Sequence, residues 1–159
     1  MVVRSDPTGE KGGLMQTTLR PGLAGAGRLK IVDGLTVPSV HHALSAFADM
    51  PRVFATAYLV AFVEATCIEA IAPVLPAGQH SVGTHVDLSH VAATPIGMTV
   101  SAEVELIEVA GRRLRFRVTC HDDTDLICRG HHERHVIDLA KFNDRVITKA
   151  AASGNDESS

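Results

Sequence analysis

The chain has 159 residues, 45% of them hydrophobic and 21% charged, which is enough for one hydrophobic core and too little for two ordinary domains. A formal net charge of -3 provides no basic surface of the kind that attracts nucleic acid or anionic lipid, so neither is an expected partner. Cys67, Cys120 and Cys128 cannot all pair, and their spacing matches no zinc motif. We therefore expect a reducing compartment, and because residues 1–13 lack the apolar run of a secretory signal, a cytoplasmic location.

Both ends of the chain are polar and rich in small residues. Residues 1–20 contain many glycines, threonines and charges, and the chain ends in AASGNDESS. Such segments cannot bury enough apolar surface to fold. The sequence therefore predicts flexible tails at 1–20 and 150–159 around a single domain at 21–149.

The next feature is an apolar run at residues 53–72, VFATAYLVAFVEATCIEAIA. Asp49 and Pro51 before it and Pro73 after it are typical helix start and stop signals. Such a helix would be about 30 Å long, which is enough to span a membrane. Two glutamates interrupt the run and no basic flank orients it, so we favour a helix buried on most of its sides in a soluble domain. Burial of that kind needs a broad surface that covers the helix, and a β-sheet is the expected one.

Five further segments have the composition of strands and are bounded by Gly, Asp or Pro. They lie near residues 29–32, 81–89, 98–109, 113–120 and 126–137. A short helix is expected at 140–149. The predicted architecture is α+β, with the long helix on one face of an antiparallel sheet.

Two of these strands indicate how they pair, because each alternates apolar with charged residues. A three-residue turn at 109–111 would align their apolar faces, and a one-residue slip would bury the arginines. The expected pairs are Glu108 with Arg112, Glu105 with Arg115, and Glu103 with Arg117.

Glu64 is the most informative single residue, because a charged carboxylate in a buried helix costs several kcal/mol unless it is paired or neutralised. A structural ion pair, or a position at the helix edge that reaches water, would also explain it. Glu69, nearer the end of the helix, is expected to be a solvated charge.

The histidines form no metal motif. On a strand, His131, Glu133 and His135 share one face while His132 and Arg134 share the other, so HHERH is not predicted to bind a metal. Taken alone, His90 is an ordinary polar residue at a strand end, and Thr56 is an ordinary residue of the first helical turns. Thr56 and Glu64 lie about 12 Å apart along one helix, so they cannot contact each other within it.

Read together, four segments resemble the fluoroacetyl-CoA thioesterase family of hotdog enzymes. They are VFAT at 53–56, Glu64, SVGTHVDLSHVAATPIG at 81–97, and HERHVIDLAKFN at 132–143. The similarity runs without a gap from about Met50 to the C-terminal helix and includes the GRR turn at 111–113. The resemblance implies a hotdog fold, in which a sheet of five to six strands wraps a long central helix. It also implies a homodimer with its active sites at the subunit interface.

The resemblance places the family's catalytic threonine, glutamate and histidine at Thr56, Glu64 and His90. It places the glycine that admits the acyl carbonyl at Gly83 and the pocket arginine at Arg134. Thioester hydrolysis needs a nucleophile or base, donors for the oxyanion, and an acid for the departing thiolate. Glu64 can be the nucleophile or the base, His90 the proton-transfer partner, and Thr56 a positioning hydroxyl or acyl acceptor.

The sequence departs from the family at the gate of the pocket. Met50 stands where the family has a phenylalanine, and Phe47 is expected to keep part of the lid. Methionine is flexible and lacks a rigid ring, so we expect a short-chain acyl-CoA rather than strict selection of fluoroacetyl-CoA. No cofactor or metal is implied. A hotdog protein that binds acyl-CoA without hydrolysing it is the alternative, and the three retained catalytic residue types argue against it. A hotdog hydratase would need an Asp-His motif that the sequence lacks.

Overall fold

The structure is a computed structural model that describes residues 18–154. All of the predicted elements are present in it. In chain order they are β1 (Ala24–Lys30), α1 (Thr56–Ile71), β2 (Gln79–His90), β3 (Thr99–Ala110), β4 (Arg113–His121), β5 (Leu126–Asp138) and α2 (Leu139–Ala152). Three short 3-10 helices, η1 (Asp33–Leu35), η2 (Val37–Ser39) and η3 (Ser45–Phe47), lie between β1 and α1, and η4 (Ala72–Val74) follows α1.

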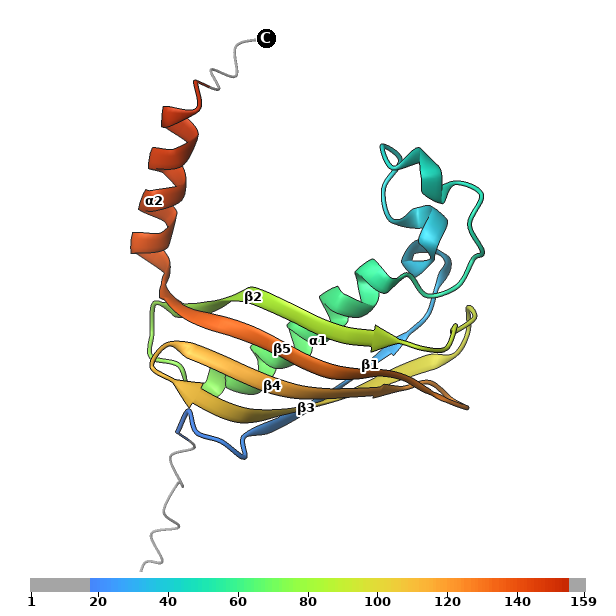
Figure 1. Ribbon diagram of the computed structural model, residues 1–159, viewed down its shortest axis with the longest axis horizontal. Helices are drawn as coiled ribbons and strands as arrows, with labels where there is room; N and C mark the ends of the chain where they lie inside the picture. The colour runs from blue at the N-terminus through green and yellow to red at the C-terminus, as the bar shows by residue number, and fades with distance from the viewer. Residues whose placement is uncertain (1–17, 155–159) are drawn as a thin grey trace, which may run out of the picture.

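The strands form one antiparallel sheet in the order β1-β3-β4-β5-β2, with α1 across one face (Figure 1). The α+β prediction is confirmed. Because β2 lies at one edge of the sheet, only one of its two sides pairs with a described strand. Helix α2 and the segment of η1–η3 both extend beyond this edge, at opposite ends of the sheet.

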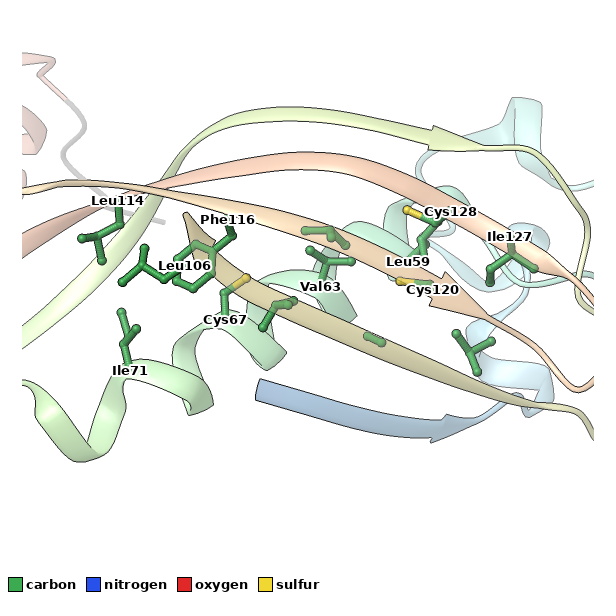
Figure 2. Packing of buried hydrophobic residues seen from close by; sticks show 14 of the residues in the cluster. Leu59, Val63, Cys67, Ile71, Leu106, Leu114, Phe116, Cys120, Ile127 and Cys128 are labelled. Atoms are coloured by element: carbon green, nitrogen blue, oxygen red, sulfur yellow. The ribbon is translucent and has the colours of Figure 1, made fainter. Parts of the chain in front are cut away.

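The core lies between α1 and the sheet (Figure 2). Apolar residues recur every four positions along α1, at Leu59, Val63, Cys67 and Ile71, and all four are buried. They meet the inward-facing residues of β3, β4 and β5, and each buried leucine or isoleucine contributes roughly 1.5–3 kcal/mol.

The opposite side of α1 is open. Ala57, Ala61 and Ala65 are exposed, and Ile68 keeps 41% of its surface exposed. The expectation that this helix is buried on most sides is therefore wrong within one chain, because the sheet covers only one side of it. By length and composition alone, the helical stretch Thr56–Val74 could cross a membrane. Its buried face, however, is packed against the sheet.

The β3–β4 pairing keeps the predicted faces but not the predicted register. The turn contains two residues, Gly111 and Arg112, and Gly111 has a φ of +61°, which suits glycine. Glu105 consequently lies opposite Arg117 instead of Arg115.

The same shift, together with an irregularity between Leu106 and Glu108, places Glu108 opposite Arg115 and Glu103 opposite Thr119. Because the slip amounts to two residues, apolar side chains still face one another, as Val104 faces Val118.

Three boundaries also differ from the predictions. Strand β1 begins at Ala24, earlier than expected, because Gly25 and Gly27 let the sheet approach α1 where any side chain would collide. Helix α1 begins at Thr56, because Val53 and Phe54 form β-bridges instead.

Helix α2 continues to Ala152, so residues 150–152 are helical and the predicted tail cannot begin at 150. Residues 18–20 form neither helix nor strand, while 1–17 and 155–159 lie outside the described residues.

Candidate active site

Thr56 and His90 lie side by side at one end of α1. Thr56 is the first residue of α1 and His90 the last of β2, and Thr56 Oγ1 lies 2.7 Å from His90 Nδ1. Two main-chain hydrogen bonds anchor the segments beside them: Phe54 N–H donates to Thr94 O, and Val91 N–H donates to Ile127 O. The structure therefore brings together two of the three predicted catalytic residues.

The second ring nitrogen of His90 has no partner of its own in the described part of the chain. His90 Nε2 is buried and has no hydrogen-bond partner within residues 18–154. The Phe54 ring meets the imidazole edge-on, with centroids 6.4 Å apart. Burial lowers the pKa of His90 below its ordinary value, so the ring is neutral at pH 7 and can either take or give a proton.

Thr56 and His90 line a cavity of about 260 Å³, together with Phe54, Val91 and neighbouring apolar side chains. A larger hollow of about 500 Å³ lies beside β1, β3 and β4 and is lined by the pair Glu105 and Arg117. None of the predicted catalytic residues lines that hollow.

Glu64 belongs to a second cluster, centred on Arg134. Arg134 is 3% exposed, and its Nη1 donates to Glu64 Oε1 at 3.0 Å. The side chain of Glu64 is 37% exposed. The two alternatives left open for this glutamate, an ion pair and an edge position, therefore both describe it.

Ser81 accepts further hydrogen bonds from Arg134 in this cluster. Arg134 Nε donates to Ser81 Oγ and Nη2 donates to Ser81 O, both at 2.8 Å. These contacts cross from β5 to β2, the two strands whose pairing places Gly83 opposite Arg134. A fixed guanidinium can hold a carboxylate or polarise a carbonyl group.

Gly83 passes directly beside Glu64. A Cβ atom at this position would collide with Glu64 Oε1 and would also crowd His132 and Arg134. Only glycine allows this close approach of the backbone. The structure therefore gathers Glu64, Gly83 and Arg134 in one place.

The two clusters are separate within one chain. No hydrogen bond or ion pair within residues 18–154 joins Glu64 to Thr56 or His90. The two predicted gate residues are also apart from the cavity at His90: Phe47 ends η3, and Met50, which is 47% exposed, follows it. One copy of the chain thus holds the predicted catalytic residues in two separate clusters.

Sequence reasoning missed His132 and Ser81, both of which contact Arg134. His132 alternates with Arg134 on the strand, so the pattern did place it on the same face, but nothing in the pattern gave it a role. His131 and His135 lie on the other face of β5, where Glu133 pairs with Arg113 and Arg115. Within residues 18–154, no group of histidine, cysteine and acidic side chains could hold a metal ion.

Comparison with known proteins gives consistent matches. The fluoroacetyl-CoA-specific thioesterase family matches residues 37–140. The fluoroacetyl-CoA thioesterase of Streptantibioticus cattleyicolor is 49% identical over 106 residues, which are 67% of this chain and 76% of that protein. A crystal structure of the fluoroacetyl-CoA thioesterase FlK has a TM-score of 0.80 at 42% identity and covers 82% of this chain and 97% of its own. A Thermus thermophilus thioesterase superfamily member, at 22% identity and a TM-score of 0.75, supports the fold.

The fold, the paired threonine and histidine, and these matches define a hotdog-fold thioesterase, an enzyme that hydrolyses acyl-CoA thioesters. The chain belongs to the fluoroacetyl-CoA-specific thioesterase family. The resemblance noted in the sequence is therefore confirmed.

Proposed function

We propose that the protein hydrolyses a short-chain acyl-CoA to the free acid and CoA, in a site that two copies of the chain complete together. The observation that carries this proposal is the division of the reactive groups. Thr56 and His90 sit at one cavity, while Glu64 sits with Arg134 elsewhere on the same chain. A thioesterase needs all of them around one thioester.

In such a site each group has a distinct task. Glu64 acts as the nucleophile or as the base that activates water, with Arg134 fixing its carboxylate. Neutral His90 transfers the proton that ends on the departing CoA sulfur, and Thr56 orients the ring or accepts the acyl group. The backbone at Gly83, free of a side chain, lets the Glu64 carboxylate lie directly against β2.

The edge of the sheet supports a homodimer. Strand β2 has one unpaired side among the described strands, and its residues 83–87 are exposed. Val86, on this edge, is 46% exposed, and α1 presents an open apolar side next to it. Unpaired strand edges with exposed apolar residues favour pairing with another strand, and a second β2 is the self-complementary partner.

The residue expected at the gate of the pocket bears on which acyl groups the enzyme accepts. Met50 stands where the family has a phenylalanine and provides no rigid ring for narrow selection of the acyl group. Variants of FlK have been solved in complex with fluoroacetate and with acetyl-CoA. The substrate class that we propose for this chain therefore includes acetyl-sized groups. The three buried free thiols support a cytoplasmic location.

The decisive experiment compares Glu64→Gln with Glu69→Gln, which changes an exposed glutamate on the same helix. With an acyl-CoA panel and a thiol-reactive dye, kcat of Glu64→Gln should fall by about a hundredfold or more while the melting temperature stays close to native. Glu69→Gln should behave like the native enzyme. If Glu64→Gln loses stability but keeps kcat, Glu64 is structural and the proposed role is wrong.

A further inference from the structure

His132 is the one fully buried histidine within residues 18–154. It lies on the inner face of β5, two positions before Arg134, and none of its surface is exposed. A buried polar group needs hydrogen-bond partners, because leaving one unsatisfied costs about 1–3 kcal/mol. The hydrogen-bond partners of His132 therefore indicate its role.

The first partner fixes the tautomer. His132 Nδ1 lies 2.8 Å from the main-chain oxygen of His85, and a carbonyl oxygen can only accept, so Nδ1 carries the proton. The pairing of β2 with β5 shifts between Gly83 and His85, so Thr84 is an extra residue in the ladder. Such a bulge changes the direction of backbone groups. Here the His85 carbonyl beside it accepts a hydrogen bond from the side chain of His132.

The second partner uses the remaining nitrogen. Burial lowers the pKa of His132, and the charge of Arg134 lowers it further, so the ring stays neutral. With Nδ1 protonated, Nε2 can only accept a hydrogen bond. Arg134 Nη1 lies 3.1 Å from it and is the donor.

Arg134 is consequently held on every side. Its Nη1 donates to both Glu64 Oε1 and His132 Nε2, while Nε and Nη2 donate to Ser81. These contacts use four of the five N–H donors of a guanidinium. Without the His132 acceptor, one buried N–H would lose its partner, and the guanidinium plane could rotate away from Glu64.

We infer that His132 is a positioning residue, whose fixed tautomer orients Arg134 and, through it, the carboxylate of Glu64. The inference rests on the proposed catalytic role of Glu64. His132 is too deep to touch a substrate, so its effect should appear in kcat rather than in KM. A histidine that only fills the core would affect stability alone.

Two variants separate these roles. His132→Gln keeps an acceptor near the position of Nε2, whereas His132→Leu keeps bulk without an acceptor. We expect His132→Leu to lower kcat by about tenfold or more with KM nearly unchanged, and His132→Gln to recover most of that loss. His131→Leu, on the outer face of the same strand, is the matched control and should keep native kcat. Equal, near-native kcat in His132→Leu and His132→Gln would overturn the inference.

The tautomer itself can be tested in the native protein, whatever the variants do. Two-bond proton–nitrogen correlation spectra of histidine-labelled protein should show His132 neutral with the proton on Nδ1. A proton on Nε2 would contradict the inference. Measuring Glu64→Gln in the same assay separates the two proposals. A fully active Glu64→Gln defeats the proposed function, whereas an inactive Glu64→Gln beside a fully active His132→Leu defeats only the positioning role.

Discussion

The backbone of Gly83 runs so close to the Glu64 carboxylate that a single methyl group would displace it. The nearest atom is the far end of a flexible side chain, so the chain can fold around the change at little cost. The ion pair of Glu64 with Arg134, however, would be disturbed.

We therefore predict that Gly83→Ala lowers kcat by about tenfold or more while the free energy of unfolding changes little. Gly34→Ala adds the same methyl group where nothing lies within 4 Å and is the control. Steady-state kinetics and urea unfolding of the two variants check this. A Gly83→Ala enzyme with native kcat would show that the carboxylate tolerates displacement.

Two histidines near the site make stability depend on pH. Burial lowers the pKa of both His90 and His132 in the folded protein relative to an unfolded value of about 6.5. The unfolded chain thus binds protons first as the pH falls. The stabilisation is complete above pH 6.5 and is lost as the pH falls through the lower pKa values of the folded state.

The free energy of unfolding, measured with urea between pH 7.5 and 4.5, should therefore decrease below about pH 6.5. His90→Gln should make this decrease shallower, because it removes one of the two groups. His121→Gln changes an exposed histidine and should leave the slope as it is. A slope that is the same in all three proteins would contradict the assignment to His90.

Among the secondary-structure elements, the β3–β4 hairpin shows what a sequence pattern can and cannot determine. Alternation determines which residues face the core, and both faces were predicted correctly. A shift of two residues preserves those faces, so only the turn selects the register, and a two-residue turn at Gly111 replaced the expected three.

We predict that Gly111→Ala destabilises the protein by about 1–2 kcal/mol, because an alanine with a positive φ is sterically strained. Nothing lies within 4 Å of the added methyl group, so no collision contributes. Gly34→Ala again serves as the control, since its φ is not positive. Equal unfolding free energies for the two variants would show that the turn relaxes without strain.

The candidate site, like the hairpin, could be predicted from the sequence only in part. Glu64 stands out from the sequence pattern alone, whereas Thr56, His90, Gly83 and Arg134 are singled out only by the family resemblance. The structure gives each of the five a partner or a close neighbour. Which of them meet depends on how α1 packs on the sheet and how β2 pairs with β5, and both bring together segments far apart in the chain. The extra residue Thr84, and with it the bond from His132 to the main chain, leaves no trace in an apolar pattern.

At the scale of the whole molecule, the proposed dimer would join the two clusters that one chain keeps apart. If Glu64 of one copy serves His90 of the other, then a dimer of one His90→Ala chain and one Glu64→Gln chain contains one doubly altered site and one intact site. Random pairing of the two chains should place an intact site in half of all dimers and restore about a quarter of the native sites.

This can be measured by unfolding and refolding the two inactive proteins together and comparing kcat per chain before and after. Refolding each variant alone is the control and should give no recovery. If all catalytic groups came from the same chain, the mixture would stay as inactive as its parts.

In genetic terms, if two copies complete each site as proposed, inactivating substitutions at Thr56 or His90 form one group of alleles and those at Glu64 form another. Alleles from different groups should complement each other in a merodiploid cell, and alleles from the same group should not. A substitution of either group that inactivates a folded chain should also be recessive, because a mixed dimer with a native chain would keep one working site. The boundary between the complementation groups would then map, without any structure, which residues share a subunit around each bound thioester.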